Sequence, residues 1–202
     1  MRFQTSLLIL LMLLGLIGAD AQSGFESSLT GNTDFTAYEC LELPNGHLVF
    51  IGPENLLNGI GRSKMVLLDG AGNFLGENTL ALDSVSLLST RLLYHQGYLI
   101  ALGYADDLRT DSSFLHYVRL DENLTVLGQR FHDLGMADLF IVNALIDETT
   151  ENIIAAGTGN KTQGGISNAP FAARLNLEGE LLFLVVCKKR DNMNSFFSSN
   201  AS

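Results

Sequence analysis

Gly97-Tyr-Leu-Ile-Ala-Leu-Gly103 is one of three copies of the same pattern, a short apolar run that ends on a glycine. The other two copies are Gly46-His-Leu-Val-Phe-Ile-Gly52 and Glu151-Asn-Ile-Ile-Ala-Ala-Gly157. After a polar stretch, each copy is followed by a second matching segment: Lys64-Met-Val-Leu-Leu-Asp69, His116-Tyr-Val-Arg-Leu-Asp121 and Phe171-Ala-Ala-Arg-Leu-Asn176. Self-similarity at a spacing of roughly 50 residues is typical of a repeat architecture, so the repeat is the starting point for the fold.

The three copies stay aligned without gaps beyond the second segment. Apolar pairs fall at equal offsets from its last residue, namely Phe74-Leu75, Val126-Leu127 and Leu181-Leu182. Turn residues such as Pro44-Asn45-Gly46 divide each unit into four short segments. We therefore expect four strands per unit, at residues 37–43, 47–51, 64–68 and 74–80, then 90–95, 98–102, 115–120 and 125–131, then 141–146, 152–156, 171–175 and 180–186.

The second strand of each unit is apolar almost throughout, which is typical of a strand covered on both faces. Blades of a β-propeller provide that environment, because each blade lies between two neighbours. The sequence thus predicts an all-β fold in which three four-stranded antiparallel units, at about residues 35–82, 88–133 and 139–186, pack as blades of an incomplete β-propeller. Closed propellers typically have about four to eight blades. Three units therefore indicate a truncated form of a longer protein, an assembly of copies, or an open stack of sheets.

The order of apolar run, glycine, polar loop, Arg-Leu-Asp and turn resembles the propeller-type repeats of large secreted proteins from Bacteroidetes-like bacteria. Gly97-Tyr98-Leu99-Ile100 and Arg119-Leu120-Asp121 carry the resemblance, which covers about residues 35–186. The chain departs from the family pattern because it has no tryptophan, and Gly76, Gly128 or Phe183 stands in that place. The resemblance implies a secreted repeat protein and transfers no catalytic residue.

The amino terminus has the layout of a cleaved secretory signal peptide over residues 1–21. Arg2 supplies the positive charge, residues 7–17 are apolar, and Ala19-Asp20-Ala21 is a small-residue cleavage site. A transmembrane helix needs about 20 apolar residues, and this run is shorter. We expect a mature repeat domain over residues 22–186 that is secreted or periplasmic, with no membrane span after cleavage. The repeat pattern stops at Cys187, so an irregular tail is predicted over residues 187–202.

Charge and cysteine content narrow the range of partners. The net charge is −10, and Lys188-Lys189-Arg190 is the only basic block, which argues against nucleic acid and anionic membranes as partners. Cys40 and Cys187 would lie in an oxidising compartment, where a bridge could join the first unit to the end of the last. The alternative is that Cys40 is a small buried apolar residue and Cys187 a free thiol in the tail.

Motifs for metals, cofactors and catalysis are not found in the sequence. Asp69-Gly-Ala-Gly-Asn73 lacks the third and sixth residues of a calcium loop, and the four histidines lack the spacing of metal ligands. Gly157-Thr-Gly-Asn-Lys-Thr162 lacks the glycine that precedes the lysine of a phosphate loop. No Gly-x-Ser-x-Gly elbow occurs. We therefore expect neither a metal site nor a cofactor.

The alternating direction of the strands brings the long connections, residues 53–62, 104–113 and 158–169, to one end of the units. Long loops on a rigid scaffold concentrate binding residues. The candidate binding residues are Asp106, Asp107, Arg109 and Asp111, and the alternative is a solvated acidic loop. We expect a non-enzymatic exported module that binds a protein or glycan at this face and that can self-associate through exposed strand edges. The alternative function is an extracellular hydrolase or lyase whose propeller is incomplete.

Overall fold

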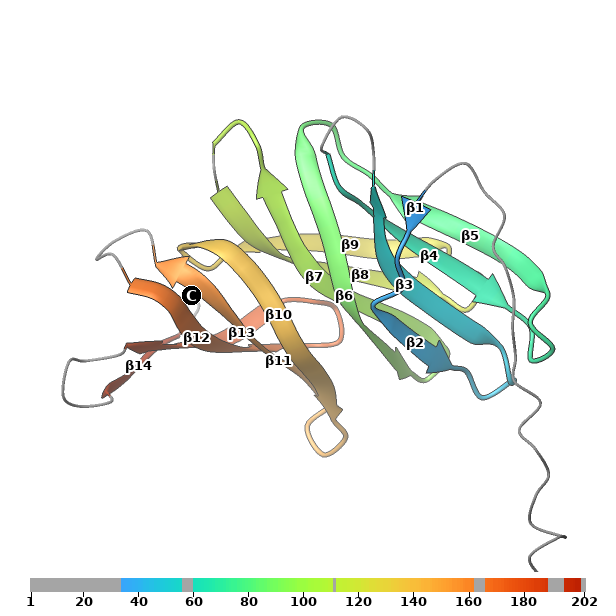
Figure 1. The fold of residues 1–202 in the computed structure, drawn as a ribbon. Coiled ribbons are helices and arrows are strands. Elements are labelled where there is room, and N and C mark those ends of the chain that lie inside the picture. Colours follow the sequence, from blue (N-terminus) through green and yellow to red (C-terminus); the bar gives the residue numbers. More distant parts are fainter. Residues whose placement is uncertain (1–33, 56–59, 111, 162–165, 189–194, 201–202) are drawn as a thin grey trace, which may run out of the picture.

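The computed structural model describes residues 34–55, 60–110, 112–161, 166–188 and 195–200 (Figure 1). The regular structure in these residues consists of β-strands in three antiparallel sheets that follow one another along the chain. The all-β fold class is confirmed. No helix suited to crossing a membrane occurs in this part of the chain. The predicted signal peptide, residues 1–21, and the candidate residue Asp111 lie outside the described residues.

The first sheet contains β1 (Asp34–Phe35), β2 (Glu39–Glu42), β3 (Leu48–Asn55), β4 (Arg62–Leu68) and β5 (Phe74–Leu80). Both β1 and β2 pair with β3, so together they form one interrupted first strand. The interruption is spanned by backbone hydrogen bonds, from the Thr36 N–H to the Pro53 carbonyl and from the Tyr38 N–H to the Ile51 carbonyl. The first unit is therefore a four-stranded meander whose first strand is split.

The second sheet contains β6 (Val85–His95), β7 (Tyr98–Asp107), β8 (Ser112–Asp121) and β9 (Val126–Asp133). The third contains β10 (Met136–Asp147), β11 (Asn152–Lys161), β12 (Ile166–Leu175), β13 (Leu181–Lys188) and β14 (Ser195–Asn200). The four strands expected in each unit are confirmed.

The prediction of an irregular tail over residues 187–202 was wrong for its described residues, 187–188 and 195–200, which are in strands. Strand β13 continues to Lys188, and β14 pairs antiparallel with β13 between Phe183 and Lys188. The physical reason is that β13 would otherwise present a row of unpaired backbone groups along its outer edge, which a following segment can satisfy. Comparison of repeats could not reveal β14, because the first two sheets end at their fourth strand.

The turn between the third and fourth strands is the same in all three sheets. It begins at Asp69, Asp121 or Asn176, whose side-chain oxygen accepts the backbone N–H groups two and four residues later. These hydrogen bonds are 2.8–3.1 Å long. The residue three positions after the start has a positive φ in each turn, 86° at Gly72, 66° at Leu124 and 76° at Gly179. The gap-free alignment of the three units is therefore confirmed at the level of individual hydrogen bonds.

The glycine that ends each apolar run has a steric role. A Cβ at Gly52, Gly103 or Gly157 would lie 1.8, 1.9 or 2.2 Å from a carbonyl oxygen of the neighbouring first strand, that of Thr36, Leu88 or Phe140. Close to these points the register shifts between Ser89 and Arg91 in β6, and between Ile141 and Asn143 in β10. Only glycine leaves space for the irregular backbone of the first strand at this position.

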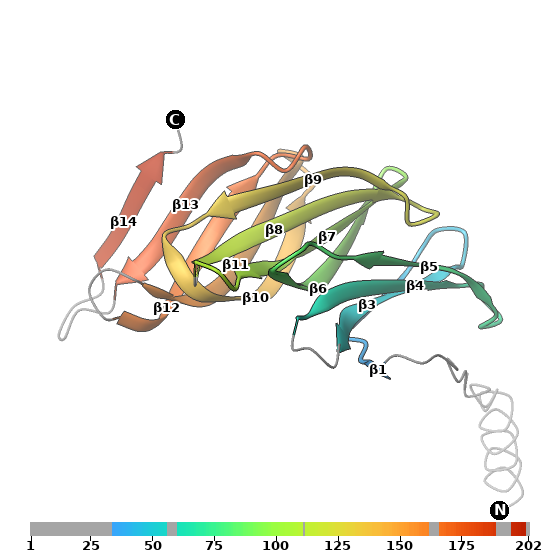
Figure 2. The same ribbon diagram turned by 90° about the horizontal axis from the view of Figure 1, so that it is seen from above.

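The second sheet lies between the other two (Figure 2). Leu99 and Ala101 of β7 belong to a first core, shared with the first sheet, whereas Ile100 and Leu102 belong to a second core, shared with the third sheet. All four side chains are at most 1% exposed. The prediction that the apolar second strand is covered on both faces is therefore confirmed for β7. Strand β6 packs on β2, β3 and β4, and β10 packs in the same way on β6, β7 and β8.

Candidate functional site

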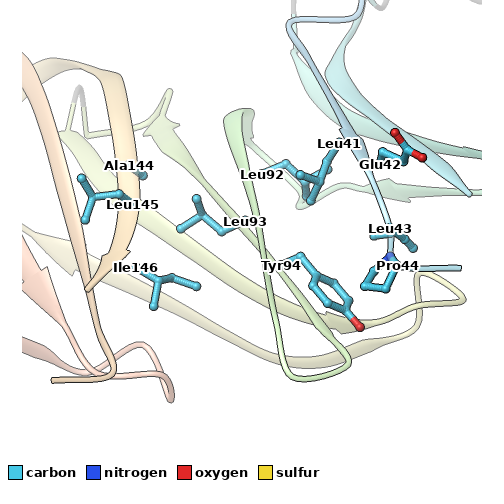
Figure 3. A pocket seen from close by; sticks show the side chains of 10 residues that line it. All are labelled: Leu41, Glu42, Leu43, Pro44, Leu92, Leu93, Tyr94, Ala144, Leu145 and Ile146. Carbon is cyan, nitrogen blue, oxygen red and sulfur yellow. The ribbon is translucent and has the colours of Figure 1, made fainter. Parts of the chain in front are cut away.

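A groove of about 650 Å³ opens at the end of the molecule where the first strand of each sheet turns into the second (Figure 3). It is formed by the last residues of β2, β6 and β10 together with the turn after β2. Figure 3 shows one group of side chains from each of these strands. The lining residues are Leu41, Glu42, Leu43, Pro44, Leu92, Leu93, Tyr94, Ala144, Leu145 and Ile146.

Three leucines of the groove occupy equivalent positions in the repeat. Leu41, Leu93 and Leu145 are opposite Val49, Ile100 and Ile154, which align in the three second strands. Leu41 packs against the first core and Leu93 against the second core. Leu145 remains 49% exposed. The apolar character of the groove therefore follows from the same strand position used three times.

The polar groups of the groove are concentrated near β2 and the end of β6. Glu42 is exposed, and the Tyr94 hydroxyl donates a 2.7 Å hydrogen bond to Oε1 of Glu122 in the turn after β8. This bond to the Glu122 carboxylate raises the pKa of the Tyr94 hydroxyl, which therefore stays protonated at neutral pH. The arrangement combines an aliphatic floor with carboxylates at one rim. Such a surface suits a ligand that carries aliphatic groups and a positive charge.

Glu39 connects two of the strands that form the groove. Its Oε2 accepts the backbone N–H of Leu92 at 2.5 Å, across the junction between β2 and β6. Burial raises the pKa of the Glu39 carboxyl, while the Leu92 N–H and the nearby Arg91 oppose that rise. This contact fixes the position of β6 relative to β2, and thereby the spacing of the two groups of side chains.

The candidate residues predicted from the sequence lie at the opposite end of the sheets. Asp107 accepts the Arg109 backbone N–H at 2.9 Å and the Arg109 Nε–H at 3.1 Å, and these bonds hold the pKa of its carboxyl below the ordinary value. Oδ1 of Asp106 accepts the Ser113 hydroxyl at 2.5 Å. The described residues of this group are thus bonded within their own hairpin. Their role in binding stays a prediction.

Alignment of the three repeats could not reveal the groove, and the reason is geometric. Its equivalent leucines lie on the first strands, where bulges and unequal turns disturb the alignment of the repeats. Gln96-Gly97 joins β6 to β7, whereas the longer segment 148–151 joins β10 to β11. The repeat is regular from the second strand onward, and the groove is built from the part that precedes it.

The two cysteines form no bridge. Cys40 lies on β2 of the first sheet, Cys187 lies on β13 of the third, and both are free thiols. Cys40 is exposed as a residue, so the expectation of a small buried apolar side chain was wrong. Partial burial of the thiol and the nearby Glu39 and Glu42 raise the pKa of Cys40, which makes it a poor nucleophile. Within the described ranges, no group of three acidic, histidine or cysteine residues is placed to hold a metal ion.

Comparison with protein-family models finds none that matches this chain, and comparison with curated proteins finds no relative. The resemblance to secreted bacterial propeller repeats therefore stays a prediction that depends on the repeat motifs alone.

Proposed function

We propose that this chain is an exported, non-catalytic repeat module that binds a protein segment, and that its sheets pack as blades of an incomplete β-propeller. The observation that carries the proposal is the groove formed by equivalent residues of β2, β6 and β10. The first strands of propeller blades surround the central axis. In such an arrangement the groove would lie at the mouth of that axis.

The packing of the sheets supports a blade-like arrangement. The first strand of each later sheet crosses the face of the preceding sheet, since β6 contacts β2, β3 and β4, and β10 contacts β6, β7 and β8. The same face is used at both junctions, because Val49 lies in the first core and the aligned Ile100 lies in the second. Repetition of one sheet-to-sheet relation is what a propeller requires.

The chemistry of the groove favours a protein segment over a glycan. Its floor is aliphatic, and the hydroxyl of its one aromatic side chain, Tyr94, is already bonded to Glu122. Among the described strands, β2, β6 and β10 each pair on one side only, so their other edges lie beside the groove, apart from positions such as the Leu92 N–H that side chains already occupy. An extended peptide can hydrogen-bond to such an edge while its side chains enter an apolar groove. Glu42 would select a lysine or arginine on that peptide.

Screening the purified protein against peptide and polysaccharide panels tests this proposal. We expect binding to peptides that combine aliphatic and basic residues, and we expect Glu42→Lys to weaken it about tenfold. The matched control is Glu148→Lys, at an exposed glutamate in the turn after β10 that does not line the groove. Equal affinities of the two variants would contradict the groove as the binding site.

Two other results of the same screen would point elsewhere. Glycan binding that is lost in Asp106→Asn would place the site at the long-loop end. Turnover of a polysaccharide that depends on a loop carboxylate would contradict the non-catalytic proposal and favour the hydrolase or lyase.

A further inference from the structure

The third sheet has one face in the second core and another face against which no other described sheet packs. The latter, called the outer face here, is lined by alternate residues of β10 to β13, because neighbours such as Ile153 and Ala155 point into the core. Leu145 is 49% exposed, and its companions are half-buried. The apolar side chains of the outer face are Leu145, Ile154, Ala156, Ala172, Phe183 and Val185.

The equivalent face of each preceding sheet is covered by another sheet. Val49 in the first sheet is 0% exposed and Ile100 in the second is 1% exposed, whereas the aligned Ile154 in the third is half-buried. Strand-to-strand contacts show the same trend. Arg91 of β6 donates from Nε to the Val142 carbonyl of β10 at 2.7 Å, whereas Asn143, at the corresponding position of the third sheet, is exposed and accepts the N–H of its own neighbour Ala144. This face is thus built to pack against a β-sheet.

The outer face carries little charge despite a net charge of −10 for the chain. Arg174 and Asp147 lie on it, and their charges are opposite. Hydrogen bonds from Thr150 and Thr149 lower the pKa of Asp147, and Arg174 contributes to that shift. Two such faces can therefore meet without a large repulsion between like charges.

The opposite end of the stack does not offer a matching surface. On the outward side of the first sheet, Val66 and Leu68 are already 1% and 2% exposed. Lys64 occupies that side as well, with its Nζ 3.6 Å from Oε1 of Glu54 and 2.9 Å from Oε2 of Glu77. A head-to-tail contact would have to bury this charged cluster, which is unfavourable.

We propose that two copies of this chain associate through the outer faces of their third sheets, around a two-fold axis. A contact of one face with itself closes at two copies and does not form a filament. Four strands about 4.8 Å apart, each about eight residues long at about 3.3 Å per residue, present roughly 500 Å². Two faces then bury about 1,000 Å², at the lower limit of specific interfaces, so the dimer is a weak one.

Sedimentation of the purified protein over a concentration series of about 1–200 μM tests this proposal. We expect a reversible equilibrium between monomer and dimer, and we expect Leu145→Lys and Ile154→Lys each to remove the dimer. Leu127→Lys on β9 is the matched control, since Leu127 is 47% exposed and does not lie on the outer face. Circular dichroism of every variant verifies that the sheets remain folded.

The use of Ile154, which does not line the groove, separates this association from ligand binding at the groove. A wild-type protein that stays monomeric at every concentration would overturn the proposal, and a different β-rich partner would then be the occupant. A dimer that persists in both lysine variants would overturn it too, as would polymers that grow with concentration.

Discussion

The Tyr117 hydroxyl of β8 donates a 2.5 Å hydrogen bond to the Leu177 carbonyl in the turn after β12, and so joins the second sheet to the third. The ring is 1% exposed and packs on Gly179, where a Cβ would come within 2.3 Å of it. Burial raises the pKa of the hydroxyl to about 12, so it remains a donor at any physiological pH.

Removal of this hydroxyl is therefore expected to weaken the junction of the two sheets. Tyr117→Phe leaves the Leu177 carbonyl without its donor, at a cost of about 1–2 kcal/mol in the free energy of unfolding. Tyr98→Phe is the control, because Tyr98 is 43% exposed and its ring contact with Arg119 survives the change. Urea unfolding curves measure the stability of both variants. Equal midpoints for the two variants would show that the inter-sheet hydrogen bond adds nothing to stability.

The repeat glycines allow a sharper comparison. Gly103→Ala would place a Cβ 1.9 Å from the Leu88 carbonyl oxygen, so the first strand must move and stability falls by about 3 kcal/mol. Gly128→Ala, in β9 of the same sheet, meets no atom within 4 Å and is expected to change stability by less than about 1 kcal/mol. Thermal unfolding of the two variants shows whether Gly103 is required for steric reasons, or whether replacing any glycine of this sheet destabilises the protein.

Asp121 is predicted to act through its side-chain oxygen and not through its charge. Asp121→Ala removes the acceptor for the N–H groups of Asn123 and Thr125 and should lower stability by about 1–2 kcal/mol. Asp121→Asn keeps that acceptor, and Asn176 already fills the same role in the third sheet. We expect Asp121→Asn to retain most of the wild-type stability in urea unfolding. A loss as large as that of the alanine variant would mean that the carboxylate charge is required.

These positions also show why much of the fold could be predicted from the sequence. Gly103 and Asp121 meet backbone requirements that recur wherever the same meander forms, so they repeat at fixed spacing and mark their strands. The groove and the outer face arise differently. They depend on where Leu145 and its equivalents point after bulges have shifted the first strands, and on which sheet lies opposite. Spacing along the chain does not specify those relations.

His116 makes the stability of the second sheet depend on pH. It is 0% exposed, its Nε2 contacts Nε2 of Gln129 at 2.8 Å, and its ring stacks on Phe131 at 4.8 Å between centroids. Nδ1 has no hydrogen-bond partner among the described residues, and burial lowers the pKa of the imidazole to about 4. The folded protein therefore holds this histidine neutral at a pH where the unfolded chain, with an ordinary pKa of about 6.5, takes up a proton.

Because the unfolded state binds the proton more tightly, the free energy of unfolding should fall as pH decreases from about 6.5 to about 4. The slope is about 1.4 kcal/mol per pH unit, for a total of about 3.5 kcal/mol, and the loss ends below about pH 4. His116→Phe keeps a ring against Phe131 and should flatten this part of the profile. His47→Gln, at a turn, should retain the slope, because that side chain is not buried. Chemical unfolding from pH 4 to 8 measures the free energy of unfolding of the wild type and of both variants. An unchanged slope in His116→Phe would show that other groups cause the pH dependence.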